Sequence, residues 1–485
     1  MNIDEILGLL KQVSEEVDKL KAKSEQSSII IDQEKKLLRL AKEYPITSHI
    51  LRSSEETIRY DYIAVLISLF NTNYDEYLRL QRMLLVYRII ASFDDKINMS
   101  EYVAKSMKVD IKYWDDFMST LDFQTAFYFA VDVLLLGMYD VKSSKIRKYE
   151  EISDVFQFLR LDRKIIEKVA KIAKSIMEQD FGLLLKQIEP LDKIDYSCFL
   201  KYFEDVPFTG VVNDIGSAKQ MEGNVLIVNA KVSHVEDIIN LDEFMANDIC
   251  FSDCTFEFIR GIKSCNKSVI FEGCSFEENI INTTEHRSMF GGSYTECEEN
   301  NVFIEGSNLK FVRSKFINCK VSKSLLNISN AELVQCEFVG CLGNELPCSY
   351  LIDLKKGKVD NCKFVNCKIE TNKKNRGNTF GGILLIENCN VHECVFNNCK
   401  SYGNSGYGSY ATYAMQILCA VNSKISECSF EQCYCSTCDS SKRTVTNYII
   451  ELRNSKEENN VFTDCQSYHY RYSDIGSSHN VGSLG

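Results

Sequence analysis

Cysteine is the residue type of this chain that could take part in the most kinds of chemistry, because its thiolate can bind metals or attack electrophiles. None of the 21 cysteines lies in the first 197 residues. The densest group is CSFEQCYCSTC, in which Cys428, Cys433, Cys435 and Cys438 could offer four thiolates to Zn²⁺. Cys428 and Cys433 also occupy positions of a repeat described below. We therefore expect buried free thiols here and no metal.

Carboxylates form a second group with possible chemistry, at the turn FDDKINMSEY. Asp94, Asp95 and Glu101 could present oxygens to a hard cation such as Ca²⁺ or Mg²⁺. Their spacing lacks the regular alternation of oxygen ligands found in an EF-hand loop. The alternative is helix capping beside a solvated turn, because carboxylates are favourable at a helix N-terminus.

Catalytic patterns of other kinds are absent from the sequence. It contains no G-x-S-x-G, no G-x-x-x-x-G-K-[ST] and no H-E-x-x-H, and its six histidines are dispersed. We expect no catalytic residues and no cofactor.

The cysteines belong to a repeat with the consensus apolar-x-x-C-x-F-x-x-C. Its anchoring phenylalanines are Phe256, Phe276, Phe316, Phe338, Phe364, Phe396 and Phe430, with a degenerate last copy at Phe462. The clearest cysteines two residues before them are Cys336, Cys362, Cys394 and Cys428. Alternation within C-x-F points every second side chain inward, as a strand requires. A second apolar strand precedes most copies.

One such unit cannot bury a core alone, so stacked units must place like residue on like residue. The pattern resembles right-handed parallel β-helices of the pectate-lyase-like type, and locally resembles pentapeptide-repeat solenoids. Most enzymes of the first type act on polysaccharides through paired carboxylates or carboxylate-held Ca²⁺. Here the outward acids, such as Glu337, Glu393 and Glu427, are scattered, so an enzyme is the less favoured alternative.

The N-terminal half has helical periodicity. Apolar residues at three- and four-residue steps predict helices at about 54–71, 75–93, 99–107, 121–139, 149–159 and 163–179. A heptad seam of apolar residues between 3 and 40 either packs on its own domain or forms a coiled coil between copies of the chain.

Residues 84–107, LLVYRIIASFDDKINMSEYVAKSM, resemble the signature of tellurite-resistance TerB-like domains, with Ala91, Asp94, Asp95, Ile97 and Glu101 at the matching positions. That family usually has Asp-Gly in the turn, where this chain has Asp-Asp. The resemblance covers about residues 75–180. It implies a helical bundle, a bacterial source and a context of stress or phage defence.

Charge limits the classes of partner. The chain has a net charge of −12 and no basic block, so binding to a nucleic-acid backbone is not expected. The longest nearly apolar stretch, 127–139, is shorter than the roughly 20 residues that a bilayer requires. No secretory signal is evident at the N-terminus, so we expect a cytoplasmic protein with reduced thiols and no membrane contact.

Two loops are candidate contacts for a protein partner. Residues 280–299 contain His286 and Arg287. Residues 400–413, KSYGNSGYGSYATY, mix tyrosine with glycine and serine, a composition typical of adaptable contact loops. Its candidate contact residues are Tyr402, Tyr407, Tyr410 and Tyr413.

The sequence thus predicts a multidomain α plus β protein, an N-terminal helical bundle followed by a C-terminal parallel β-helix solenoid. The expected parts are a coiled-coil-like helix at 1–45, a helical bundle at 46–195, a linker and cap at 196–222, the β-helix at 223–475 and a flexible tail at 476–485. The expected function is non-enzymatic recognition or scaffolding of a macromolecular partner. The alternatives are a polysaccharide-acting lyase or hydrolase, and an acidic solenoid that mimics DNA.

Overall fold

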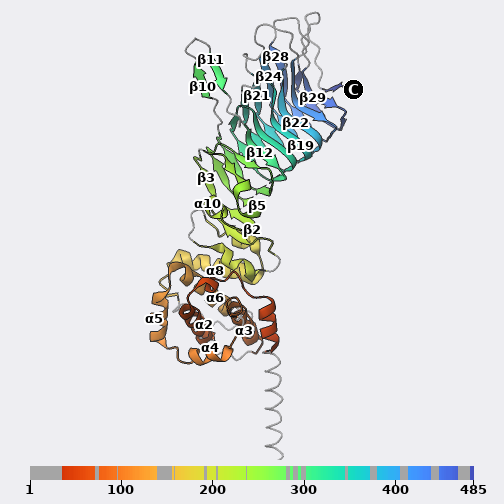
Figure 1. Ribbon diagram of the computed structural model, residues 1–485. Helices are drawn as coiled ribbons and strands as arrows, with labels where there is room; N and C mark the ends of the chain where they lie inside the picture. The colour runs from red at the N-terminus through yellow and green to blue at the C-terminus, as the bar shows by residue number, and fades with distance from the viewer. Residues whose placement is uncertain are drawn as a thin grey trace, which may run out of the picture. The chain divides into compact units, whose positions relative to one another are not determined.

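The structure is a computed structural model (Figure 1). It describes residues 35–70, 76–94, 97–138, 156–157, 159–189, 194–203, 206–235, 237–279, 284–287, 293–296, 302–344, 348–371, 379–404, 413–438, 447–467 and 481–484. The chain divides into two compact units, which are described separately. The helical unit comprises residues 1–187 and 193–206, and the β unit comprises residues 188–192 and 207–485.

The helical unit begins, in the described part, with helical residues 35–43. Its further helices are η1 (Ile50–Ser53), α2 (Glu56–Phe70), α3 (Glu76–Ile90), α4 (Met99–Ser106), α5 (Ile111–Thr120), α6 (Phe123–Met138), α8 (Arg163–Glu178), α9 (Phe181–Leu185) and η3 (Tyr196–Tyr202). Five of them match the predicted helices within a few residues. Most of the helix predicted at 149–159, and the seam predicted at 3–40 up to residue 34, lie outside the described residues.

Local sequence explains where these helices begin and which face they bury. Asp162 accepts a hydrogen bond from the Ile165 amide at 2.9 Å, which caps the N-terminus of α8. Helix α6 is apolar on nearly all sides and is almost entirely buried. Helix α5 was missed from the sequence because it spans only three turns and buries few side chains, chiefly Phe117 and Met118. Among the described residues, no helix is long and apolar enough to span a membrane.

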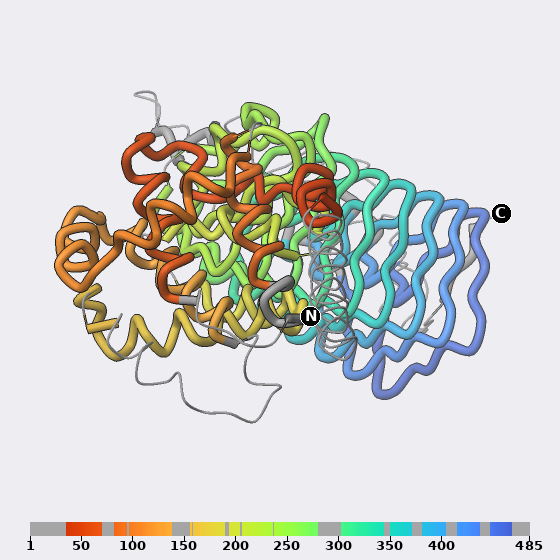
Figure 2. The backbone as a smooth tube through the Cα atoms, turned by 90° about the horizontal axis from the view of Figure 1, so that it is seen from below, coloured from red at the N-terminus to blue at the C-terminus, as the bar shows by residue number. Residues whose placement is uncertain are grey.

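The β unit contains three parallel sheets, and the chain visits them repeatedly in the same order. Sheet A has the strands β1 (Gly210–Val212), β2 (Gly223–Val228), β5 (Ala246–Ser252), β8 (Ser268–Glu272), β13 (Leu309–Val312), β16 (Ser324–Val334), β19 (Cys348–Asp360), β22 (Thr379–His392), β25 (Tyr413–Val421), β29 (Tyr448–Arg453) and β33 (Val481–Leu484), with β4 (Ile239–Asn240), β7 (Ile262–Ser264), β12 (Val302–Ser307), β26 (Lys424–Ser426) and β30 (Lys456–Glu458) paired beside them. Sheet B has β3 (Lys231–Ser233), β6 (Thr255–Glu257), β9 (Ser275–Glu277), β14 (Lys315–Ile317), β17 (Glu337–Val339), β20 (Lys363–Val365), β23 (Val395–Asn397), β27 (Ser429–Glu431) and β31 (Val461–Thr463). Sheet C has β15 (Lys320–Val321), β18 (Leu342–Asn344), β21 (Lys368–Thr371), β24 (Lys400–Asn404), β28 (Tyr434–Cys438) and β32 (Gln466–Ser467). One passage through A, B and C is called a rung below, and successive rungs lie side by side in Figure 2.

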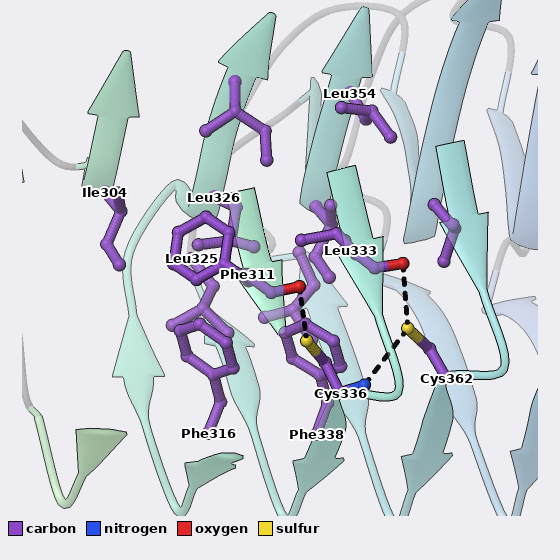
Figure 3. Packing of buried hydrophobic residues seen from close by; sticks show 14 of the residues in the cluster. Ile304, Phe311, Phe316, Leu325, Leu326, Leu333, Cys336, Phe338, Leu354 and Cys362 are labelled. Carbon is purple, nitrogen blue, oxygen red and sulfur yellow. Dashed lines mark hydrogen bonds between the residues drawn. The ribbon is translucent and has the colours of Figure 1, made fainter. Parts of the chain in front are cut away.

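Register aligns the anchoring phenylalanines of successive rungs. Phe316 pairs with Phe338, and Phe338 with Phe364, as Cα partners in sheet B. The rings of Phe316 and Phe338 stack at a centroid distance of 4.7 Å with an interplanar angle of 5° (Figure 3). The rings of Phe338 and Phe364 stack at 4.8 Å and 4°. The same stack extends from Phe256 to Phe462. A parallel column in sheet A begins with the stacked rings of Phe251, Phe271 and Phe311 and continues with aliphatic residues.

The turns between strands are built from residues in the left-handed backbone region. Asn366 and Asn398 have φ of 55° and 49°, and the Asn398 side-chain amide donates to Asn366 Oδ1 at 2.7 Å. Asn422, between β25 and β26, and Asn454, between β29 and β30, repeat this contact at 2.7 Å. Asparagine tolerates this conformation better than other non-glycine residues, so its side chain can form ladders along the stack.

The two ends of the β unit differ. Before β2 lie β1 and the short helix α10 (Ile215–Ala218), and Ala218 is part of the buried core. At the other end, Glu457 of β30 takes the place in the apolar column that Ile425 holds one rung earlier. Glu457 is exposed at this end, and a charged residue on an edge strand discourages further strand pairing. Within 476–485, expected to be a flexible tail, Val481–Leu484 form β33 because their backbone pairs with β29. Within 196–222, expected to be a linker and cap, η3 belongs to the helical unit.

Candidate functional site

Cysteines two residues before the stacked phenylalanines form a first thiol column. The Sγ atom of each inner member lies within hydrogen-bond distance of two carbonyls, one in the preceding rung and one two residues earlier in its own rung. Cys336 Sγ lies 3.4 Å from both Phe311 O and Val334 O. Cys362 Sγ lies 3.4 Å from both Leu333 O and Asp360 O. The contacts to the preceding rung are drawn in Figure 3. Cys394 has the same two kinds of acceptor, at 3.6 and 3.3 Å, whereas Cys428 contacts a carbonyl of its own rung. The column can therefore link neighbouring rungs through thiol hydrogen bonds.

A second thiol column lies three residues after the phenylalanines. The Sγ atoms of its members lie 3.2 or 3.3 Å from the phenylalanine carbonyl of the preceding rung. The members are Cys319, Cys341, Cys367, Cys399, Cys433 and Cys465. So regular a contact indicates a structural role for these thiols.

Two replacements within the columns support this interpretation. Ser314 stands in the first column and donates to Phe271 O at 3.0 Å. Asn279 stands in the second column, and its buried amide donates to Phe256 O at 3.0 Å. Ser314 and Asn279 thus keep a hydrogen-bond donor where sulfur is absent, whereas the buried Ile259, three residues after Phe256, provides none.

The described cysteines are free thiols, and all but Cys265 and Cys465 are buried. Burial raises the pKa of the Cys341 and Cys399 thiols well above the ordinary value. Among the four cysteines that could have held zinc, Cys428 and Cys433 point into separate columns, and Cys435 is buried in sheet C. These three residues do not converge on one point, and the side chain of Cys438 lies outside the described residues.

At the acidic turn, Glu101 uses its carboxylate within the protein. Its Oε2 accepts from the Tyr60 hydroxyl at 3.0 Å, and its Oε1 accepts from the Asn98 amide at 2.6 Å. Asp94 is half-buried, and Asp95 lies outside the described residues. Glu101 stands in the first turn of α4, so its placement fits the capping alternative.

The one described group of acidic, histidine or cysteine side chains that approaches metal-ligand geometry lies at the turn from sheet A to sheet B. His392, Glu393 and Glu427 place one ligand atom each within 4.8 Å of one another. Both carboxylates are exposed, and His392 also contacts Ser426 Oγ at 3.3 Å. The group brings together two acids that the sequence left on separate repeats.

Sequence reasoning missed a buried polar cluster in the helical unit, centred on Asp132 of α6. Tyr62 and Tyr202 donate their hydroxyls to its two carboxylate oxygens at 2.6 Å each, and His49 Nε2 lies 2.9 Å from Oδ2. The Leu51 amide donates to His49 Nδ1, which assigns the proton of a neutral ring to Nε2. Burial, reinforced by Asp132, raises the pKa of both tyrosines, so they remain donors. The sequence offered one indication of this cluster, namely that Asp132 lies within an otherwise apolar helix.

The candidate contact residues lie in two places. His286 and Arg287 belong to β10 (Thr284–Arg287), which pairs antiparallel with β11 (Ser293–Glu296) outside the parallel sheets. Tyr402 lies on β24 of sheet C, and Tyr413 begins β25 of sheet A. Tyr407 and Tyr410 lie between these strands, outside the described residues.

The second place repeats along the stack. We call it the C–A corner, where each sheet C strand ends and the next sheet A strand begins. The connections at this corner, 345–347, 372–378, 405–412 and 439–447, are longer than the two-residue link between β15 and β16. Other turns of the same rungs keep a nearly fixed length. Variation in length is therefore concentrated at one corner of a regular scaffold.

Around Tyr402, side chains from neighbouring rungs are in contact. The Lys368 ammonium lies 5.1 Å from the Tyr402 ring centroid, and the Tyr434 ring centroid lies 5.4 Å away. Lys368 also pairs with Glu370 at 2.8 Å. This gives sheet C an outward surface of lysine and tyrosine beside the variable connections.

On the sheet A side of the corner, polar side chains of neighbouring strands form a buried chain of interactions. The Tyr350 hydroxyl donates to Gln416 Oε1 at 3.1 Å, and the Gln416 amide donates to Glu451. Arg453 Nε pairs with the other Glu451 oxygen at 2.8 Å, although Glu451 is only 2% exposed. The network joins several rungs and satisfies a buried charge.

Comparison with known proteins does not assign this chain to a family. No family model matches the chain, and a search of curated proteins found no match. The resemblances to TerB-like domains and to pectate-lyase-like β-helices therefore rest on the residues quoted for them.

Proposed function

We propose that this chain is a non-enzymatic recognition protein. Its C-terminal unit would be a parallel β-helix solenoid that binds a protein partner at the C–A corner. Its helical unit would oligomerise or pass the binding event to a further component. The TerB-like resemblance favours a cytoplasmic bacterial protein of stress or phage defence, by analogy alone.

The observation that carries this proposal is the contrast between a regular core and one variable corner. The phenylalanine stack and both thiol columns repeat with little change over many rungs. Length changes gather where Tyr402 and Tyr413 stand. Binding specificity usually resides in loops held by a rigid scaffold, because the core leaves them free to vary.

Position-specific photocrosslinking tests the proposal. A photoreactive phenylalanine analogue replaces Tyr402 in the full chain, and a matched chain carries it at Val339 on the outward face of sheet B. Both chains are irradiated in a lysate of the source cells. We expect a discrete crosslinked protein from position 402 and none of the same mass from position 339. Equal products from both positions, or none from either, would contradict recognition at the C–A corner.

Oligomerisation through the predicted seam at 3–40 has its own test. Light scattering gives the mass of the full chain and of a variant with Leu10→Glu and Val17→Glu. A smaller particle for the variant supports a seam between copies, because charges on the seam oppose its packing. An unchanged mass contradicts it.

One observation favours the alternative of a polysaccharide-acting enzyme. Glu393, Glu427 and His392 gather on neighbouring rungs, as a carboxylate-based site would require. The enzyme alternative predicts release of new sugar ends from a panel of acidic and neutral polysaccharides, with and without Ca²⁺. It further predicts that E393Q and E427Q abolish the release. The DNA-mimic alternative gains no such support, since Lys315 and Lys363 flank Glu337 along sheet B.

A further inference from the structure

The outward face of sheet C differs in charge from the rest of the chain. Its described outward positions hold three lysines and one acid, Lys320, Lys368, Lys400 and Glu370, together with Tyr402 and Tyr434. The inward positions between them, such as Val321, Ile369 and Cys435, are buried. Over the whole sequence, 68 acidic residues outnumber 56 lysines and arginines. The topology thus brings lysines from separate parts of the sequence together on the outward face of sheet C.

Sheet B is the matched comparison within the same molecule. Its three outward lysines each have an acidic neighbour: Lys231 with Glu257 at 3.0 Å, and Lys315 and Lys363 with Glu337 at 3.5 and 3.7 Å. On sheet C, Lys368 is paired with Glu370. Lys320 and Lys400 have no ion-pair partner among the described residues. The charge of sheet C is therefore not neutralised within the described part of the chain.

Two of the connections at the C–A corner carry the same sign in the sequence, 372–378 with three basic residues and no acid, and 439–447 with two basic residues and one acid. Together, segments 345–347, 372–378, 405–412, 439–447 and 468–480 contain six lysines and arginines and three acids. They also contain five tyrosines.

We propose that the outward face of sheet C binds an acidic segment of a partner protein. Ammonium groups and phenolic hydroxyls are donors suited to carboxylates. Burial raises the pKa of Tyr402, which keeps its hydroxyl protonated. This inference rests on the proposed function and names the chemistry of the partner at the same corner.

Single-stranded nucleic acid is the competing anionic ligand, and the geometry disfavours it. Such ligands bind by stacking bases on open aromatic faces. Lys368 lies over the Tyr402 ring and Tyr434 packs against it, so this ring is already engaged. The net charge of −12 further opposes a long phosphate backbone.

The test uses a fluorescein-labelled peptide of alternating glutamate and serine, about fifteen residues long, titrated with the full chain by fluorescence anisotropy. We expect binding at about 50 mM sodium chloride that weakens at about 300 mM, because exposed charges are screened. Reversal of the sheet C lysines, with K320E, K368E and K400E together, should weaken binding by about tenfold or more. Reversal of K231E, K315E and K363E on sheet B changes the net charge equally and should change binding by less than about twofold.

Several outcomes overturn the proposal: no binding of the peptide to the unchanged chain, equal weakening by both triple variants, or tighter binding of an oligothymidine of similar charge. Circular dichroism checks that both triple variants fold. If the sheet C triple variant does not, the milder pair K320Q and K400Q takes its place and should weaken binding by about threefold. If position 402 crosslinks a lysate protein while the peptide does not bind, recognition at the corner stands and the acidic chemistry is wrong. If both experiments fail, the proposed function itself is wrong.

Discussion

The two units bury their polar groups in opposite ways. The helical unit concentrates them at one carboxylate, Asp132, which three side chains of distant sequence surround. The β unit spreads them along columns of thiols, each with its own carbonyl acceptor. A buried charge must be satisfied completely or it is costly, whereas a thiol is a weak donor that packs as a small hydrophobe. The helical unit should therefore depend on a few residues, and the β unit on many equivalent ones.

The largest expected difference between the two units is the loss of stability at alkaline pH. Burial raises the pKa of the Cys341, Cys394, Cys399 and Cys435 thiols. The unfolded chain releases these protons above about pH 9, while the folded chain holds them, so stability is intact below that pH and falls above it. Each thiol should cost about 1 kcal/mol of unfolding free energy per pH unit, or about 4 kcal/mol in all by about pH 10.

The helical unit is the control for the alkaline experiment. It contains a single cysteine, Cys198, whose pKa burial raises to about 12. Trp114, the one tryptophan of the chain, lies in α5 and reports on this unit by fluorescence. Far-UV circular dichroism reports on helices and sheets together, so the part of its unfolding transition that Trp114 fluorescence does not show is taken as the sheet signal. Above about pH 10 the buried Tyr62 and Tyr202 add their own loss to the helical unit, because the unfolded chain ionises its tyrosines there. Urea titrations between about pH 8 and pH 10 should therefore show the sheet signal losing stability several times faster than the Trp114 signal. Parallel losses in both would show that the thiols do not govern the β unit.

The second largest effect is expected at the centre of the helical cluster. Asp132→Ala leaves the donors of His49, Tyr62 and Tyr202 without their acceptor. Removing one member of a buried charged network costs about 3–4 kcal/mol. Urea unfolding followed by Trp114 fluorescence measures it, and Tyr202→Phe, which removes one donor, should cost only about 1–2 kcal/mol. A loss below about 1 kcal/mol for Asp132→Ala would mean that water replaces the carboxylate.

The third effect is the stability lost when a stacked phenylalanine is replaced by alanine, and it should depend on the position of the residue in the stack. Phe338 is fully buried and stacks on both sides, at 4.7 and 4.8 Å. Phe462 is half-buried in the last rung and stacks on Phe430 at 5.1 Å. Phe338→Ala should cost about 3 kcal/mol and Phe462→Ala about 1 kcal/mol, because a cavity at an end can collapse or fill with water. The far-UV dichroism of the sheets in urea measures both, and equal losses would argue against graded packing along the stack.

Sequence predicted the β unit better than the helical unit, for a physical reason. Phe316, Phe338 and Phe364 lie at equivalent positions of a repeat, so every repeat of the sequence indicates the same strand register. The strand-turn residues in the left-handed region, such as Asn366, were visible as asparagines but their ladder was not foreseen. It depends on the exact stacking of rungs.

The candidate sites were less accessible from sequence, because they depend on contacts between residues far apart in the chain. Asp132 meets Tyr62 and Tyr202 across 70 residues in either direction. Lys320 and Lys400 share a face only through the topology of sheet C. No spacing rule in the sequence connects such residues. Counting charges along the sequence therefore gave no basic block, although the fold places these lysines together on sheet C.

The smallest expected effect tests whether sulfur or hydrogen bonding sets the thiol columns. Cys341 donates to Phe316 O at 3.3 Å, and Ser314 shows that a hydroxyl can hold a column position with a 3.0 Å bond to Phe271 O. Cys341→Ser should therefore cost no more than about 1 kcal/mol, because the donor is kept while some apolar contact is lost. Cys341→Ala removes the donor as well and should cost about 1–2 kcal/mol. Urea titration of the sheet signal orders the two variants. If alanine were tolerated better than serine, the columns would be apolar packing sites, and the distributed hydrogen bonds would not distinguish the β unit from an ordinary core.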